Sequence, residues 1–304
     1  MPVDTYRTQS RGGRGVTAQN LKEEDYVASL NIASTHDHML FFTDRGRVHH
    51  RKGYQIPEAG RTARGTAIVN VLPLEPGESV TAMVVTREFD ENEYLMMVTR
   101  GGTVKRIPLV ALKTNRKGGI RALTLEEGDC LVNVLRTTGD DNIILATANG
   151  MAICFNENDV RPMGRDAAGV RGILLVDDVF VIGAEKAEEG KTLLTVTVNG
   201  FGKRTELQEY LRTGPNGEKI AQGRGGKGLK NYNITAKTGR IAGCRVVGEN
   251  DDVMLIENGG VIIRIPANTI NVYKRDVQGV IVMRVDEGNE VVAVQRVEPL
   301  EEEQ

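Results

Sequence analysis

Two short segments carry arginine or lysine among glycines, and they are the residues of this chain best suited to binding chemistry. The sequence reads QSRGGRG at residues 9–15 and QGRGGKG at residues 222–228. Glycine lets main-chain N–H groups come close to a ligand, and arginine binds phosphate oxygens in a bidentate manner. The pattern therefore indicates phosphate binding, which on a nucleic acid positions the backbone without reading the bases.

The same kind of segment recurs with fewer glycines. Each copy has a basic residue, one or more glycines and then a short extended run, at residues 61–70, 114–123, 165–174 and 275–284. A tight corner of the chain explains the glycines there, namely Gly65, Gly118, Gly169 and Gly279. The two dense copies hold more glycine than a corner needs, so we expect a phosphate contact from the second as well as the first.

The glycine-containing segments belong to a repeating unit of the sequence. Five units begin with an apolar run, a four-residue turn and a second extended run, at residues 39–52, 94–107, 143–156, 193–206 and 253–266. Arg-Gly or Asn-Gly between apolar runs is a strong hairpin signal, because such turns need positive φ. A glycine-containing segment and a closing apolar run follow each hairpin, which gives four short strands per unit. Four strands in about 50 residues, repeated, are typical of a propeller-like disc.

We therefore predict an all-β chain with a single domain over residues 1–304. A chain of independent β-sandwich domains is less consistent with this repeat, since each unit is too short to form its own hydrophobic core. No hairpin precedes the first glycine-rich segment, so the first blade should be incomplete. The expected divisions are blade 1 (remainder) 1–35, blade 2 36–90, blade 3 91–139, blade 4 140–188, blade 5 189–249, blade 6 250–297 and an acidic tail 298–304.

Basic residues recur at equivalent repeat positions although the net charge is only −2. On a disc, equivalent positions trace one rim, so a positive perimeter is possible despite acidic residues elsewhere. The alternative is that these are solvated strand residues that discourage edge pairing. The predicted perimeter set is Arg47, Arg51, Arg61, Arg64, Lys105, Arg106, Arg116, Lys117, Arg121, Lys203, Arg204, Arg224, Lys227, Lys230 and Arg264, with Arg165 and Lys274 in the same loops.

Catalytic and metal sites are not indicated. His36, His38, His49 and His50 lie close in sequence, but no cysteine or acidic set joins them at ligand spacing. The three cysteines are far apart and are expected to be buried free thiols. No apolar run approaches the roughly 18 residues of a membrane helix. We predict no catalytic residue, no metal and no membrane partner.

The segment at residues 9–15 resembles the gyrase A box, the signature of the C-terminal domain of the bacterial DNA gyrase A protein. Gln9, Arg11, Gly12, Gly13 and Gly15 match that motif, Ser10 stands where it has arginine, and Arg14 where it has lysine. Residues 22–78, 160–173 and 276–297 also resemble that domain, and the likeness covers essentially the whole chain.

The resemblance implies a six-bladed β-pinwheel whose blades exchange strands. It implies that double-stranded DNA bends and wraps around the perimeter, held by the box residues Gln9 to Gly15, so that the holoenzyme can introduce negative supercoils. It further implies that the chain is cytoplasmic and not itself an enzyme. The breakage-reunion domain would lie in the same full-length chain, gyrase B would join it in an A2B2 assembly, and ATP and Mg²⁺ would serve those other regions, leaving no cofactor here.

Two alternatives remain. The equivalent domain of the topoisomerase IV A protein shares the architecture, but its box is degenerate or absent, so the matched residues favour gyrase. A protein-interaction β-propeller would bind partners through loops on a disc face, with little salt-sensitive affinity for DNA.

Overall fold

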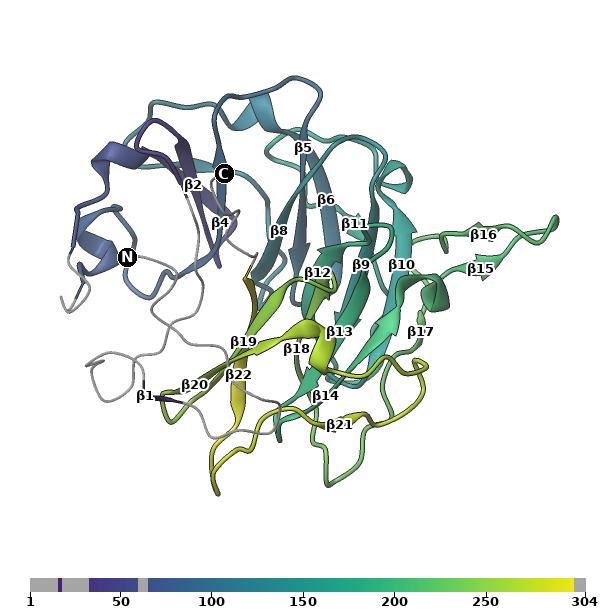
Figure 1. The fold of residues 1–304 in the computed structure, drawn as a ribbon. Helices are drawn as coiled ribbons and strands as arrows, with labels where there is room; N and C mark the ends of the chain where they lie inside the picture. The colour runs from purple at the N-terminus through teal and green to yellow at the C-terminus, as the bar shows by residue number, and fades with distance from the viewer. Residues whose placement is uncertain (1–15, 18–32, 60–64, 298–304) are drawn as a thin grey trace, which may run out of the picture.

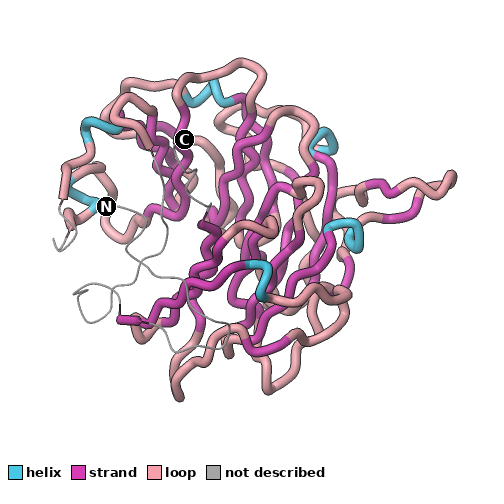
Figure 2. Tube along the Cα trace, in the orientation of Figure 1, coloured by secondary structure: helices cyan, strands magenta, loops and turns pink. Residues whose placement is uncertain are grey.

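The structure, a computed structural model, describes residues 16–17, 33–59 and 65–297. These residues form five four-stranded antiparallel sheets arranged around a common axis, together with one small two-stranded sheet (Figure 1). The only helical elements among them are short 3-10 turns (Figure 2). They are η2 (Gly53–Gln55), η3 (Ile68–Asn70), η4 (Leu109–Leu112), η5 (Glu157–Asp159), η6 (Leu207–Tyr210) and η7 (Ala267–Thr269).

The five predicted hairpins are confirmed. Their strands are β2 (His38–Thr43) with β3 (Arg47–Lys52), β5 (Tyr94–Thr99) with β6 (Thr103–Pro108), β9 (Asn142–Thr147) with β10 (Met151–Asn156), β13 (Thr192–Thr197) with β14 (Phe201–Glu206), and β19 (Asp252–Glu257) with β20 (Val261–Pro266). Each turn glycine has positive φ, as for Gly46 at 72°. In four hairpins the first strand ends in threonine, whose hydroxyl accepts the N–H four residues later, as from Thr103 to Thr99 at 3.1 Å. Glycine and threonine together fix the turn.

A third strand pairs with the first strand of each hairpin and lies nearest the axis. These inner strands are β4 (Val80–Thr86), β8 (Leu131–Thr137), β12 (Val181–Lys186), β18 (Ile241–Val247) and β22 (Val291–Val297). They contact one another in that order.

The outermost strand of every sheet has two residues and comes from a different repeat. These strands are β7 (Ile120–Arg121), β11 (Val170–Arg171), β17 (Leu229–Lys230), β21 (Val280–Ile281) and β1 (Val16–Thr17). All but β1 skip the hairpin of their own repeat and pair with the hairpin of the repeat before it, as when Leu229 lies opposite Ala152. β1 instead pairs with β20, so the segment just after the first glycine-rich motif joins the last hairpin of the chain. Neighbouring sheets are therefore tied by backbone hydrogen bonds, and β1 links the two ends of the repeat array.

The core lies between sheets, because both faces of each central strand are covered. Met97 packs with the cluster shared with the sheet before it, whereas the adjacent residue Met96 packs with the cluster shared with the sheet after it. This two-sided burial explains why the first strand of each hairpin is a continuous apolar run rather than an alternating one.

Two expectations need correction. The described residues form five blades rather than six, because the described part of residues 1–35 contributes β1 to the last sheet and no separate sheet. Each range expected for blades 2 to 6 supplies three strands of its sheet, and another repeat supplies the fourth. Cys130, Cys154 and Cys244 are free thiols, but only the last two are fully buried.

Candidate nucleic-acid interface

Within the described residues, four segments that cross from one repeat to the next lie along the outer edge of the disc. We call residues 114–124, 161–174, 222–233 and 271–281 the perimeter segments, since each contains one outermost strand. The second residue of that strand is an exposed cation in three of them, namely Arg121, Arg171 and Lys230. Each lies opposite the residue that follows a hairpin turn, as Arg171 lies opposite Thr103. The repeat therefore puts positive charge at one recurring point of the edge.

Consecutive perimeter segments are joined by hydrogen bonds. The N–H of Thr124 donates to the carbonyl of Ala167 at 3.3 Å, and its hydroxyl donates to the carbonyl of Asp166 at 2.9 Å. The N–H of Gly225 donates to the carbonyl of Gly172 at 2.6 Å. The Arg275 guanidinium donates to the carbonyl of Lys230 at 3.2 Å. The four segments thus form one connected track along the edge.

The exposed cations of this track come from all four segments. They are Arg116, Lys117, Arg121, Arg161, Arg165, Arg171, Arg224, Lys227, Lys230 and Lys274. Two of them, Arg161 and Arg171, were not in the predicted perimeter set. Arg171 had a usable signal, because Gly-Val-Arg at 169–171 matches the Gly-Ile-Arg of 119–121 and the Gly-Leu-Lys of 228–230.

Four cations expected at the perimeter are instead inside the protein. Lys105 and Lys203 have no exposed surface, and Arg106 and Arg204 are 4% exposed. The prediction was wrong for these four because it treated the second hairpin strand as the edge of the sheet. β11 covers the edge of β6, and β21 covers that of β14.

The two buried lysines fasten perimeter segments from beneath. Lys105 Nζ donates to the carbonyls of Ala122 at 2.7 Å, Arg165 at 2.7 Å and Ala167 at 2.9 Å. Lys203 Nζ donates to the carbonyls of Lys274 at 2.6 Å and Arg275 at 2.7 Å. Burial lowers the pKa of Lys105 to about 8 and that of Lys203 to about 7. These side chains position the backbone whose other cations face solvent.

The remaining predicted cations divide into two groups. Arg47, Arg51 and Arg264 are half-buried and hold internal partners, such as Glu75 for Arg47 at 2.5 Å and Asp252 for Arg264 at 2.7 Å. Arg61, Arg64 and the box residues Gln9, Ser10, Arg11, Gly12, Gly13, Arg14 and Gly15 lie outside the described residues, so their roles stay predictions.

The second glycine-rich copy, at 222–228, has the local geometry of an open loop. A Cβ on Gly228 would lie 2.3 Å from the carbonyl oxygen of Ala152, and its φ is +74°, so packing alone demands glycine there. Gly223 has nothing within 4 Å of a built Cβ, and Gly226 has only the tip of Ile153 at 3.7 Å. Packing therefore does not require glycine at these two positions.

The close-approach glycine has equivalents in the other perimeter segments. A Cβ on Gly169 would lie 2.5 Å from the carbonyl oxygen of Val104, and one on Gly279 would lie 2.4 Å from that of Gly202. In the segment at 114–124 this place belongs to Gly119, with Val48 O at 2.8 Å, whereas Gly118 is open. Glycine is therefore required by a tight corner of the chain at Gly169 and Gly279, as predicted. In the segment at 114–124 the required glycine is Gly119 and not the predicted Gly118.

A chain of directed hydrogen bonds holds the first perimeter segment to β3. Lys52 Nζ contacts His38 Nε2 at 2.8 Å, His38 Nδ1 contacts His50 Nε2 at 2.7 Å, and His50 Nδ1 contacts the carbonyl of Thr114 at 3.0 Å. Since the ammonium can only donate and the carbonyl can only accept, both imidazoles must be neutral with the proton on Nδ1. Burial lowers the pKa of both histidines, and it also lowers the pKa of the buried His49 nearby.

This chain of hydrogen bonds predicts acid sensitivity. A histidine with a lowered folded-state pKa binds fewer protons than in the unfolded chain, so stability falls as the pH drops below the ordinary value of 6.5. We expect the free energy of unfolding in urea to decrease between pH 7 and pH 5. His38→Phe cannot titrate and should lose less over that range. His36→Asn, at an exposed histidine, should behave as the parent protein does; equal pH dependence in all three would contradict the assignment.

Among the described residues, no group of three or more histidine, cysteine, aspartate or glutamate side chains is placed to hold a metal ion. Nor does any helix of the described part have the length and apolarity to cross a membrane.

Comparison with known proteins gives one consistent result. A family model described as DNA gyrase C-terminal domain, beta-propeller, matches residues 1–34, 37–87, 93–138, 141–188, 191–221, 218–248 and 251–298. The DNA gyrase A protein of Clostridium acetobutylicum is 45% identical over 302 residues, which cover 99% of this chain and 35% of that protein. The DNA gyrase A protein of Escherichia coli strain K12 is 40% identical over 303 residues, 99% of this chain and 34% of that protein. The chain thus spans about a third of these relatives.

Solved structures agree on the fold. A structure of the DNA gyrase A C-terminal domain superposes with a TM-score of 0.82 at 22% identity, covering 97% of this chain and 94% of that one. A C-terminal domain of DNA topoisomerase IV superposes with a TM-score of 0.76 at 27% identity, covering 87% and 80%.

Proposed function

Because this chain belongs to the family of DNA gyrase C-terminal β-propeller domains, we propose that it binds, bends and wraps duplex DNA around the perimeter segments. The connected track of exposed cations carries this proposal, since phosphates can be neutralised in succession along it. Most of these cations reach solvent from backbone loops rather than from a pocket, which suits contact with a DNA backbone and not base reading. Binding would therefore be largely independent of sequence.

Wrapping needs many contacts because bending is costly. Bending a short site by 40–90° costs about 1–6 kcal/mol, and a path around the edge of a disc bends DNA further. Release of counterions from each neutralised phosphate offsets that cost. The proposal extends to the box residues Gln9 to Gly15. Arg11 and Arg14 of the box correspond to Arg224 and Lys227 of the second copy, and both of these are exposed.

In the whole protein, the wrapped duplex would supply the crossing through which a gyrase holoenzyme passes one duplex to introduce negative supercoils. We propose that this chain is the non-catalytic part of that cytoplasmic enzyme. Strand breakage would belong to the breakage-reunion domain of the gyrase A protein, and ATP and Mg²⁺ would act elsewhere in an assembly with gyrase B.

The proposal predicts steep salt dependence and a need for DNA length. If the ten exposed perimeter cations each neutralise one phosphate, a plot of log K, the logarithm of the binding constant, against log salt concentration should have a slope of about −9 on a long duplex. A short duplex reaches few of these cations, so its slope should be much shallower. Gel-shift titrations with both duplexes across a range of salt measure this.

Single substitutions refine the test. Arg171→Gln should reduce the slope by about 1. Arg45→Gln is the matched control, because Arg45 is exposed but lies in a hairpin turn and pairs with Glu75 at 3.0 Å. A protein-interaction propeller would show weak binding, with the same shallow slope on both duplexes, and that result would overturn the proposal.

A further inference from the structure

A small hairpin projects from the edge of the disc beside the second glycine-rich loop. Its strands are β15 (Arg212–Thr213) and β16 (Lys219–Ile220), and they form a separate two-stranded sheet (Figure 1). The insertion explains the longest repeat spacing: Gly228 follows the turn residue Gly200 by 28 residues, whereas Gly169 follows Gly150 by 19. The blade fold does not require these extra residues, since the other units close without them.

Both legs of the hairpin are fixed to the core. Tyr210 precedes it, is fully buried and hydrogen-bonds through its hydroxyl to Asn231. Gln222 follows it, with its side-chain amide donating to the carbonyl of Tyr210 at 2.8 Å and its N–H donating to the carbonyl of Cys154 at 2.8 Å. Leu211 packs against the apolar cluster beneath. The direction of the projection is therefore set by buried contacts.

The tip is ordered by its own hydrogen bonds. The N–H of Gly214 donates to the carbonyl of Glu218 at 2.7 Å, and the N–H of Gly217 donates to the carbonyl of Gly214 at 3.0 Å. The Glu218 carboxylate accepts the N–H of Asn216 at 3.0 Å. The Glu218 carboxylate thus makes its hydrogen bond within the turn. The cations Arg212 and Lys219 are exposed on the two strands.

The composition of the hairpin points to the class of partner. Apart from the half-buried Ile220 at its base, the hairpin contains no large apolar side chain. Seven of the eight residues 212–219 are exposed, and Gly214 is half-buried. A stable protein interface has an apolar centre, which this surface lacks. A polar two-stranded ribbon with a cation on each strand instead suits the major groove of duplex DNA, which is about 12 Å wide and admits such a ribbon.

The position of the hairpin supplies the second reason. It leaves the disc directly before the perimeter segment that carries Arg224, Lys227 and Lys230, on the side of β10 and β17 (Figure 1). A duplex that follows the perimeter segments must pass it. We infer that the β15–β16 hairpin enters the major groove of the wrapped duplex, with Arg212 and Lys219 at the flanking phosphates and the tip at Asn216 deepest in the groove. This inference rests on the proposed function.

Photo-crosslinking from the tip tests it. An aryl azide is attached to Asn216→Cys in a Cys130→Ser background, because Cys154 and Cys244 are buried. The control carries the same label on Glu189→Cys, an exposed position in the connection between β12 and β13. With a long duplex, crosslinks to bases should be at least about tenfold more frequent from position 216.

Charge removal gives an independent readout that keeps the ribbon intact. Arg212→Gln with Lys219→Gln should reduce the slope of log K against log salt by about 2. Binding with the parent slope, and without base crosslinks from position 216, would overturn this inference alone. Failure of the parent chain to bind long duplex would remove the proposed function, and the inference with it.

Discussion

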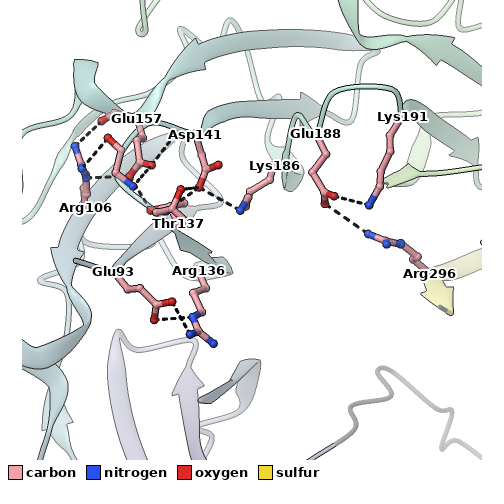
Figure 3. Close-up of polar contacts among 12 residues, drawn as sticks. Glu93, Arg106, Arg136, Thr137, Asp141, Glu157, Lys186, Glu188, Lys191 and Arg296 are labelled. Atoms are coloured by element: carbon pink, nitrogen blue, oxygen red, sulfur yellow. Dashed lines mark hydrogen bonds and ion pairs between the residues drawn. The ribbon is translucent and has the colours of Figure 1, made fainter. Parts of the chain in front are cut away.

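Arg106→Met should lower the free energy of unfolding by about 3–5 kcal/mol, because it leaves a buried carboxylate without its counter-charge. Arg106 Nε lies 3.0 Å from Glu157 Oε2, and Glu157 has no exposed surface (Figure 3). The guanidinium also stacks on the ring of Tyr94, with its central carbon 4.0 Å from the ring centroid. Loss of the arginine removes both interactions.

Glu157 keeps three hydrogen-bond donors when Arg106 is replaced. Its carboxylate accepts the hydroxyl of Thr137 at 2.7 Å and the N–H groups of Gly139 and Asp141 at 2.8 Å each (Figure 3). In the variant the buried carboxylate would keep these three donors but lack its counter-charge. Arg106→Met with Glu157→Gln should therefore recover part of the lost stability.

Urea unfolding of the single and double variants measures this coupling. Arg121→Met is the matched control, because Arg121 is exposed on β7, and a change there should stay within about 0.5 kcal/mol. If Arg106→Met were as stable as Arg121→Met, the buried ion pair would have no structural role.

Arg11→Ala with Arg14→Ala should abolish wrapping while the disc stays folded. Each arginine is proposed to make a charge-assisted contact with phosphate, and such contacts contribute about 1.5–3 kcal/mol each. The pair should therefore weaken binding of long duplex by about 100-fold or more. On relaxed circular DNA treated with a nicking-closing enzyme, the topoisomer ladder produced by the parent chain should be absent.

The second copy provides the matched comparison. Arg224→Ala with Lys227→Ala removes the equivalent cations, but Arg224 already donates to the carbonyls of Asp159 at 2.8 Å and Arg171 at 3.1 Å. Part of its donor capacity serves the fold, so we expect a smaller loss of wrapping than from the first copy. A ladder that is unchanged by the Arg11 and Arg14 variant would refute the role of the box.

Several features were predictable from local sequence because their causes are local. Gly46 and its equivalents need positive φ at a hairpin turn, and apolar runs on both sides predict the two strands. The repeat of that unit predicted a propeller-like disc, and the family model matches that fold. The cations Arg116, Arg121 and Lys230 were also correctly predicted to be exposed, since each lies in a glycine-containing segment that recurs in the repeat.

The sequence by itself determined the repeating unit, its turns and the set of basic residues; only the tertiary structure decided which strands pair and which cations reach solvent. A two-residue strand such as Val170–Arg171 pairs through backbone hydrogen bonds. Because these bonds do not depend on side-chain identity, the sequence of the strand does not indicate which hairpin it pairs with. That pairing covers β6, buries Lys105 under three carbonyls, and leaves Arg171 outside. Pairing of the same kind joins β1 to β20, which yields five described blades where the repeat count predicted six. The exchange of outer strands between repeats is a long-range interaction, so the spacing of residues along the chain does not predict it.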